Sequence, residues 1–537
     1  MGKKTIVSAV DGVRGPAVSR RDFLKMSGAG IAGAALLGVA GCGGAGQQGG
    51  GPSVLVTVLD TEPQILNGFI SGGDLAVTTD ATSGILQGPL EILPDLSYAP
   101  QLADGEPQVK SEDPLIIEYR LKEGITFSDG EPLTSADAKW TFEQIMNPDN
   151  QIVSRIGWED VEKFETPDER TVRLTFSTPY AGWRDLLDDD ILPKHVYEGK
   201  DFNKALNNEI VGSGPFKFQE WNKGEDLTVV RNENYWGKKA GLERVTYRFI
   251  SDSNTILQSL QSGEAGFIAP AAETGVFERI EGFPNTTVKS KAGTVWAHIT
   301  FNVKKVPSVK LRQAIAYGIN REQLATELLE KGLKSLDSVL VPDQEPFFAP
   351  AWGRYAHDPD KARQLLQEAE AEGVKPEITY TASSGSTLLE RQLQIIQQQL
   401  EDIGLDVTLD FDSPENLLGK RINQGDFSMV SFSWVASPDP SSTELFAGDA
   451  LPPKGQNYGL YENEEVTRLW RESDATVDPQ ARAELIRQAQ EAMAQDVPIL
   501  PLYQTPDIYA YTENLQGPEV NPTLAGPYWN MGEWTLQ

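Results

Sequence analysis

The sequence has few of the residues that build metal and redox sites. Its 537 residues include one cysteine and three histidines. One cysteine excludes an intrachain disulfide and any CxxC zinc or redox site. His195, His298 and His357 form no HExxH motif and no Cys/His cluster. We therefore expect neither a metal nor a cofactor in this protein.

Basic residues are also scarce. The chain has 47 Lys and Arg against 78 Asp and Glu, which gives a formal net charge of −31. Because phosphate contacts need a basic face, nucleic acid is excluded as a partner. The hydrophobic content of 39% is ordinary for a folded protein. At a prior of about 150 residues per domain, the length predicts roughly three domain-sized units.

An export signal is predicted at the start of the chain. Arg20 and Arg21 precede an uncharged stretch of 16 residues at 26–41. This stretch is too short for a stable membrane span, which needs roughly 20 apolar residues. A basic pair before a short apolar run is typical of a secretory signal, and paired arginines indicate the twin-arginine export route.

A lipid attachment point follows this signal. The sequence VAGC at 39–42 resembles a lipobox, in which the cysteine is diacylated and becomes the first residue of the mature protein. We therefore predict a twin-arginine lipoprotein signal peptide at 1–41, acylation of Cys42 and a flexible tether at 42–52. Two acyl chains anchor a protein stably, whereas one is marginal.

The rest of the chain alternates β-rich runs with helical patterns. Strands are predicted at 54–58, 115–121, 172–176, 227–230, 245–250 and 405–411. Helices are predicted after the capping box at 134–137, after the Asp-Pro pairs at 358–359 and 478–479, and along the apolar stripe at 389–403. This alternation predicts an α/β protein with at least two lobes.

A series of motifs, in order along the chain, resembles one protein family. The segments that carry the resemblance are PQLADG at 100–105, YRLKEGITFSDGEPLTSADAKWTF at 119–142, LPKH at 192–195, GSGPFKF at 212–218, NENYWG at 232–237, LQSGEAGF at 260–267, LRQAIAYGINRE at 311–322, HDPDKARQLL at 357–366 and DVPILPLY at 496–503. Their joint order is similar to the solute-binding proteins of peptide-type ABC importers, solute-binding family 5.

The resemblance implies a type II periplasmic-binding-protein fold, with two hinged lobes and an extra subdomain. Lobe I would comprise 53–88, 197–302 and 497–537. The extra subdomain would comprise 89–196, and lobe II 303–496. Two crossing segments, near 291–302 and 496–503, would form the hinge. A solute would bind between the lobes, and hinge closure around a ligand is a recognised domain motion.

Candidate ligand-binding residues follow from this fold, because cleft-facing loops lie at strand ends beside the hinge. The candidates are Glu62, Trp296, Ser383, Gly385, Trp434, Ser437 and Asp439. Trp434 would supply an apolar or stacking wall, since an indole combines a large contact area with one donor.

Two departures from the family pattern bear on the ligand. Peptide-binding members carry an aspartate three residues after this tryptophan, where it pairs with the α-ammonium of the peptide; this chain has Ser437 there. Asp439, two residues later, either takes that role or caps the turn between Pro438 and Pro440. The loop at 381–387 also has no arginine that could take a ligand carboxylate in bidentate fashion.

The leading hypothesis is a lipid-anchored binding protein that captures a peptide-like or other polar solute and delivers it to an ABC transporter permease. The alternatives are a receptor of the same fold for a sugar or other non-peptide ligand, and an exported hydrolase. A hydrolase needs an activated nucleophile, and the sequence has no GxSxG motif, so we expect no enzyme. We expect a monomer on the outer face of the cytoplasmic membrane, periplasmic or cell-surface, held there by Cys42.

Replacing the lipidated cysteine tests the anchor. Cys42→Ala is expected to leave the protein unprocessed or released to the medium, because it removes the acceptor thiol. Membrane fractionation and intact mass measure both results. A Cys42→Ala protein that is membrane-bound and of mature size would contradict the lipobox.

Overall fold

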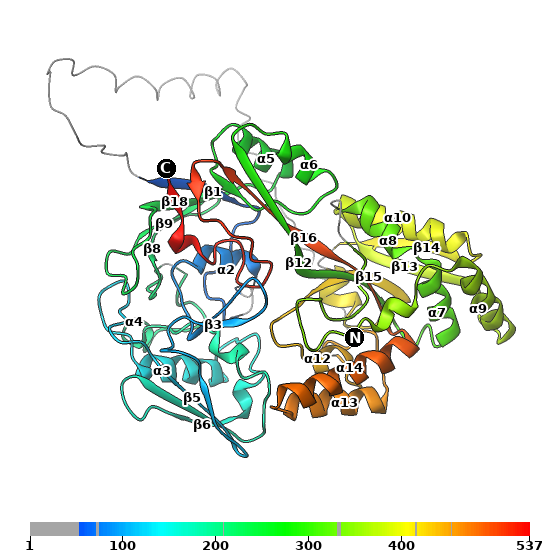
Figure 1. Ribbon diagram of the computed structural model, residues 1–537, viewed down its shortest axis with the longest axis horizontal. Coiled ribbons are helices and arrows are strands. Elements are labelled where there is room, and N and C mark those ends of the chain that lie inside the picture. The colour runs from blue at the N-terminus through cyan, green and yellow to red at the C-terminus, as the bar shows by residue number, and fades with distance from the viewer. Residues whose placement is uncertain are drawn as a thin grey trace, which may run out of the picture. The chain divides into compact units, whose positions relative to one another are not determined.

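The computed structural model describes residues 53–70, 73, 75–207, 209–329, 334–413, 416–452 and 454–537 (Figure 1). Arg20, Arg21, Cys42 and the tether lie outside the described residues. Contacts group the chain from Pro52 onward into one unit. None of its described helices combines the length and the apolar character that crossing a bilayer requires.

Ten strands of the described residues form one sheet, in the order β14-β13-β15-β12-β16-β11-β1-β10-β9-β8. In chain order these strands are β1 (Val54–Leu59), β8 (Phe216–Asn222), β9 (Asp226–Arg231), β10 (Arg244–Phe249), β11 (Phe267–Ile268), β12 (Thr286–Phe301), β13 (Glu377–Ser383), β14 (Asp406–Asp412), β15 (Met429–Val435) and β16 (Ile499–Thr512). The predicted strands at 54–58, 227–230, 245–250 and 405–411 are confirmed as β1, β9, β10 and β14.

Two long strands connect the two ends of this sheet. β12 has 16 residues and β16 has 14, and they pair antiparallel from Thr286 opposite Thr512 to Thr300 opposite Ile499. The register shifts between Ala292 and Trp296. Figure 1 shows both strands crossing the middle of the molecule. The two segments that the sequence assigned to a hinge therefore lie in one strand pair.

Three smaller sheets complete the β structure of the described residues. An antiparallel sheet in the order β4-β5-β7-β6 contains the strands predicted at 115–121 and 172–176. Its strands are β4 (Gln108–Glu112), β5 (Leu115–Arg120), β6 (Val161–Glu165) and β7 (Thr171–Phe176). The other two sheets are the pairs β2 (Leu90–Ile92) with β3 (Tyr98–Pro100) and β17 (Leu515–Gln516) with β18 (Thr535–Leu536).

The helices begin where capping residues stand in the sequence. Asp358 accepts a hydrogen bond from the Lys361 amide and Asp478 from the Ala481 amide, each just before a proline in the first turn. The helices are α2 (Ala76–Thr82), α3 (Ser135–Met146), α4 (Lys194–Tyr197), α5 (Ser253–Gln261), α6 (Val276–Glu281), α7 (Val309–Gly318), α8 (Arg321–Leu328), α9 (Pro359–Ala371), α10 (Thr387–Glu401), α12 (Thr443–Phe446), α13 (Glu464–Ala475) and α14 (Pro479–Asp496), with a π-helical turn η4 (Leu417–Arg421). All four predicted helix positions are confirmed.

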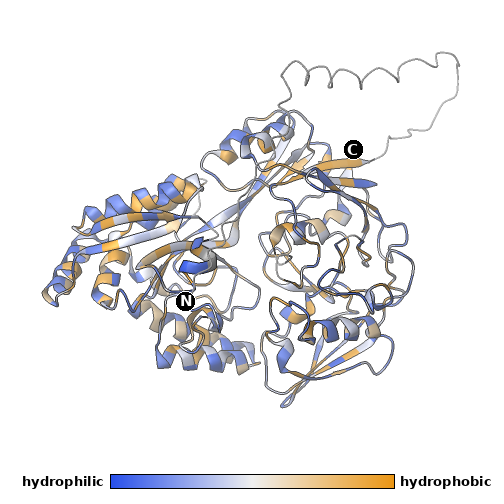
Figure 2. Ribbon diagram, turned by 180° about the vertical axis from the view of Figure 1, so that it is seen from behind, coloured by the Kyte–Doolittle hydropathy of each residue, from blue (hydrophilic) through white to orange (hydrophobic). Residues whose placement is uncertain are grey.

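Amphipathic helices cover the β13 end of the large sheet. In α10, Leu393, Ile396 and Leu400 are buried, and they belong to the stripe read from the sequence. Figure 2 shows hydrophilic residues on the outer faces of the helices at this end. The apolar faces pack on the sheet and form the largest core of the described residues.

Apolar cores divide this unit into three parts. We call the part around β13–β15 and α7–α14 lobe II, the part around β1 and β8–β11 lobe I, and the part around β4–β7 the extra subdomain. Tyr528 and Trp534 complete the lobe I core, where the Tyr528 hydroxyl lies 2.7 Å from the Thr57 hydroxyl of β1. The residue boundaries given above for these parts stay predictions.

The capping box of α3 generates a test of the extra subdomain. The Thr134 hydroxyl accepts from the Ala136 amide, and the Asp137 carboxylate accepts from the Thr134 amide at 2.9 Å. Thr134→Ala is expected to lower the free energy of unfolding by about 1 kcal/mol, because it removes the cap. Denaturant unfolding measures the change, and Glu143→Ala, on the exposed face of the same helix, is the control. Equal stabilities of the two variants would contradict a stabilising cap.

Candidate functional site

Three strands of lobe II end at one edge of the sheet. β13 runs parallel to both β14 and β15, so their carboxyl ends share that edge. Ser383 is the last residue of β13, and Trp434 is the last but one of β15. Gly385 follows in the turn to α10 with φ +95°, a conformation that favours glycine. In open α/β sheets, ligands bind at the carboxyl ends of strands.

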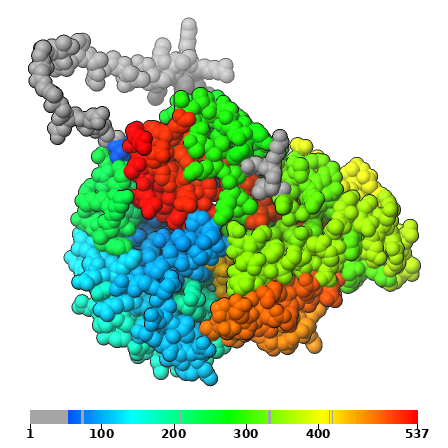
Figure 3. Space-filling view, viewed as in Figure 1, coloured from blue at the N-terminus to red at the C-terminus, as the bar shows by residue number. Residues whose placement is uncertain are grey.

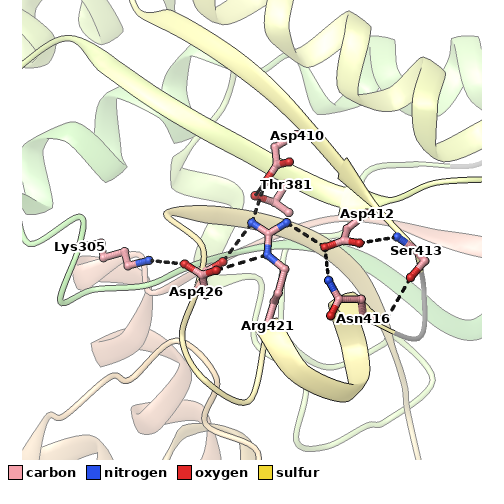
Figure 4. A network of polar contacts seen from close by, with 8 residues as sticks. All are labelled: Lys305, Thr381, Asp410, Asp412, Ser413, Asn416, Arg421 and Asp426. Carbon is pink, nitrogen blue, oxygen red and sulfur yellow. Dashed lines mark hydrogen bonds and ion pairs between the residues drawn. The ribbon is translucent and has the colours of Figure 1, made fainter. Parts of the chain in front are cut away.

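An arginine that the sequence analysis did not single out lies near this edge (Figure 4). Arg421 at the end of η4 reaches Asp410 at 2.7 Å, Asp412 at 3.2 Å and Asp426 at 3.6 Å. Hydrogen bonds from Asn416, the Ser413 amide and Arg421 outweigh desolvation and hold the pKa of Asp412 below its ordinary value. This guanidinium is therefore occupied by carboxylates of the chain itself.

Aromatic side chains surround Trp434. It is opposite Trp296 in the β12–β15 register, and its ring lies parallel to that of Tyr458 with 5.8 Å between centroids. Trp434 is half-buried, whereas Trp296 is 2% exposed and belongs to the lobe II core. Burial lowers the pKa of the adjacent His298 to about 3. The imidazole is therefore neutral at physiological pH.

Asp439 forms a buried ion pair. Its two carboxylate oxygens accept hydrogen bonds from Arg482 of α14 at 2.6 and 2.8 Å, and the two side chains are 10% and 6% exposed. Asp439 also accepts from the Ser441 amide, and its carbonyl accepts from the Ser437 hydroxyl. Asp439 therefore caps the turn, as one sequence alternative proposed, and its charge is balanced within the protein.

Glu62 lies in a different environment from these lobe II residues. Its carboxylate accepts hydrogen bonds from the Trp221 indole at 3.0 Å and from the Gly224 amide at 3.1 Å. Both partners belong to the β8–β9 hairpin of lobe I. The structure thus pairs Trp296 with Trp434 and joins Ser437 to Asp439. It places Ser383 and Gly385 at the end of β13 and Glu62 against the hairpin.

A chamber of about 250 Å³ has walls from lobe I and the extra subdomain, and none of the residues predicted from the sequence lines it. Four of its lining residues are acidic, and the lining contains no Lys, Arg or His. The lining residues are Gly68, Phe69, Thr78, Thr79, Thr82, Ser83, Leu86, Gly88, Glu91, Ile92, Gln101, Asp188, Asp189, Asp190, Leu524, Ala525 and Trp529. We call this space the acidic chamber.

The carboxyl groups of the acidic chamber hold protons more tightly than free carboxyl groups do. Burial raises the pKa of Asp190 to about 7, with a contribution from Asp189. Burial raises the pKa of Asp189 to about 6, although the Trp158 indole donates to it at 2.7 Å. Burial and the two neighbouring aspartates also raise the pKa of Asp188. A cation in the chamber would release these protons.

Three more carboxyl groups gather next to the chamber. Asp80 is on α2 between the chamber residues Thr79 and Thr82. Burial, followed by repulsion from Asp60 and Asp507, raises its pKa to about 8. Burial raises the pKa of Asp507 on β16 to about 7. Acidic groups that hold their protons tightly are therefore concentrated where the strands that cross between the lobes meet lobe I.

A family model described as "Bacterial extracellular solute-binding proteins, family 5 Middle" matches residues 97–449 of this chain. The match covers more than half of the sequence. The chain belongs to this family. A second model, described as "TAT (twin-arginine translocation) pathway signal sequence", matches residues 17–36, which include Arg20 and Arg21. This solute-binding protein therefore carries an export signal of the predicted type.

Curated relatives match this solute-binding protein over most of its length. Glutathione-binding protein GsiB of Salmonella paratyphi A is 27% identical over 448 residues, which are 80% of this chain and 85% of GsiB. Oligopeptide-binding protein AppA of Bacillus subtilis is 25% identical over 523 residues, which are 91% of this chain and 92% of AppA. Both relatives are named as binding proteins.

Solved structures share the fold of this solute-binding protein. The periplasmic EDTA-binding protein EppA superposes with a TM-score of 0.82 at 22% identity, over 90% of this chain and 96% of EppA. AppA of Bacillus subtilis superposes with a TM-score of 0.74 at 24% identity, over 90% of this chain and 99% of AppA. The predicted type II periplasmic-binding-protein fold is confirmed.

Sequence reasoning missed the acidic chamber and the partner of Asp439. The apolar pairs Leu186-Leu187 and Ile191-Leu192 flank the run Asp188–Asp190, but no motif indicates that the aspartates themselves line a chamber. Asp80 is on a short helix with no cap from a side chain. Arg482 follows Asp439 by 43 residues. The only local signal was the unusual run of three aspartates.

The raised pKa of Asp80 generates a stability prediction. The ordinary pKa is 3.8 and that in the folded protein about 8, so the folded state binds a proton more tightly. The free energy of unfolding therefore falls as the pH rises between these values. Asp80→Asn, which is neutral, is expected to raise the melting temperature at pH 8.5 and to change it little at pH 4.5. Glu243→Gln, at an exposed lobe I carboxylate, is the control, and equal effects of Asp80→Asn at both pH values would contradict the assignment.

Proposed function

We propose that this protein captures a polar solute that carries an ammonium or other cationic group, peptides included, and delivers it to an ABC transporter permease. The observation that carries the proposal is the acidic chamber, whose lining has four acidic residues and no basic residue. An isolated charge is costly to bury, so the chamber carboxyls are partly protonated when no cation is present. A cationic solute would pair with them.

Two of the relatives support a peptide-like solute. GsiB is named for glutathione and AppA for oligopeptides, and both kinds of compound carry an α-ammonium group. In this chain Asp439 is paired with Arg482, so we propose that the ammonium is bound by the acidic chamber and Asp80 instead. We also propose that Trp434, near the carboxyl end of β15, contributes an aromatic wall, as the sequence predicts.

A sugar or other non-peptide solute is the second candidate. The observation in its favour is the parallel arrangement of Trp434 and Tyr458, since flat aromatic faces suit the apolar face of a ring. The first candidate requires a positive charge on the ligand, and the second does not.

Delivery requires that the protein be held close to its transporter. The family is extracellular and the signal model matches residues 17–36. We propose that Cys42 is acylated and anchors the mature chain as a monomer on the outer face of the cytoplasmic membrane. The segment at 42–52 would act as a tether between lipid and protein.

A matched pair of peptides tests the ligand class. We expect a tripeptide with a free amino terminus to bind and its N-acetylated form to bind at least tenfold more weakly, because acetylation removes the charge. At 100 times the dissociation constant, the free peptide should stabilise the protein by about 2.7 kcal/mol. Titration calorimetry and thermal shift measure both effects.

The pH dependence and one variant give the controls. Binding must displace protons from carboxyls with raised pKa values, so the affinity is expected to increase from pH 5.5 to pH 7.5, below the pKa of about 8 at which the peptide's own α-ammonium loses its charge. Asp80→Asn should weaken binding although it stabilises the fold. Equal binding of both peptides would contradict the ammonium proposal, and binding of a neutral disaccharide alone would favour the second candidate.

A further inference from the structure

A short segment of the extra subdomain touches lobe II. The Ala181 amide donates a hydrogen bond to the Asp474 carbonyl at 2.8 Å. Beside it, a Cβ on Gly182 would lie 3.2 Å from the Asp439 side chain. Val477 of lobe II packs against the core of the extra subdomain. We call residues 180–185 the contact segment.

The surface of lobe II that meets this segment is held in place by charge. Arg482 and Asp439 form the buried bidentate pair described above. The Asp474 carboxylate accepts hydrogen bonds from the Ser441 and Thr443 hydroxyls, each at 2.6 Å. These contacts join the loop after β15 to α13 and α14. We call Asp439, Asp474 and Arg482 the platform.

The platform residues are held in a fixed arrangement by contacts among themselves, independently of the contact segment. A doubly hydrogen-bonded Arg–carboxylate pair fixes both the distance and the plane of its groups. Breaking it would leave an uncompensated buried charge, which is strongly unfavourable. The contact segment meets this surface through the Ala181–Asp474 backbone hydrogen bond, a hydrogen bond from the Asp439 backbone to the Asp185 carboxylate and the packing of Val477.

Asp185 lies at the end of the contact segment. One of its carboxylate oxygens is buried and has no hydrogen-bond partner among the described residues. Burial, followed by repulsion from Asp439 and Asp188, raises its pKa, and Arg482 opposes this shift. Tyr180 on the same segment and Asp474 on α13 complete the titratable groups around the pair of Asp439 and Arg482. A negative charge on Asp185 is therefore unfavourable while the contact is made.

The contact lies away from the strands that connect the lobes. In Figure 1, α13 and α14 are at the lower edge of the view, below the crossing of β12 and β16. Figure 3 shows a furrow between the blue-to-cyan and the green-to-orange residues, with the orange residues of lobe II against the other side at its lower end. A contact in this position resists opening of the furrow more effectively than one beside the hinge.

We propose that the contact segment and the platform form a latch that holds the extra subdomain and lobe II together over bound solute. The proposal rests on membership of the solute-binding family and not on the charge of the ligand. Asp188, the first of the three aspartates that line the acidic chamber, lies three residues after the contact segment. The latch is therefore joined directly to the chamber along the chain. Loss of the latch would shorten the time that solute is held.

A wedge at Gly182 tests the latch in the full chain. Gly182→Leu is expected to place its side chain against Asp439 and to speed hydrogen exchange of the peptide that covers residues 179–186 at least tenfold, because the Ala181 amide loses its acceptor. Gly182→Ala should have a smaller effect. Gly282→Ala, at the end of α6 in lobe I, is the control, and melting curves establish that each variant is folded.

A second variant is expected to act in the opposite direction. Asp185→Asn keeps the shape and removes the charge, so at pH 8 exchange of the same peptide should slow at least threefold relative to the unchanged protein. The two should converge as the pH is lowered, because the raised pKa of Asp185 then leaves its carboxyl group protonated. Exchange is measured without solute, so failure of the peptide titrations would leave this test intact. Unchanged exchange in a folded Gly182→Leu protein, or faster exchange in Asp185→Asn, would overturn the latch.

Discussion

The pairing of β12 with β16 is the constraint on which the rest of the structure depends. Lobe II joins this pair through β15, and lobe I joins it through β11. All other strands of the large sheet are added outward from these contacts. Between Ala292 and Trp296 the ladder is interrupted, and a gap in backbone hydrogen bonds is where a strand pair bends most easily. A second register shift follows between Ala297 and His298, so we expect any bending between the lobes to occur in this stretch of the pair.

The carboxyl groups near this hinge show how function opposes stability. Burial of these acids costs free energy, which is why their pKa values are raised, and a well-packed apolar wall would be more stable. Under the proposed function, a cationic ligand would offset this cost. Such a cost in stability is found at binding sites, because a bound molecule can offset it there. By contrast, Arg421 and Arg482 form ion pairs with carboxylates of the chain itself.

Local signals in the sequence predicted the elements well, and long-range contacts limited the rest. Asp358, Asp478 and Thr134 cap helices through amides two or three residues away, so their positions could be read directly. The fold followed from the order of family motifs. The two roles left open for Asp439 could not be separated, because its ion-pair partner is on a helix 43 residues away. The burial of Asp188–Asp190 depends on α2 and the C-terminal segment, which no local pattern indicates.

The hydrogen bond between Thr57 and Tyr528 has a consequence for the order of folding. It joins the first strand to a residue 471 positions later, inside the core that Trp534 also completes. Lobe I therefore cannot finish its core while the ribosome is still making this part of the chain. Lobe II and the extra subdomain draw on nearer segments and can form earlier. Contacts between residues so far apart in the sequence also slow folding. The core of lobe I therefore remains incomplete until synthesis is nearly over.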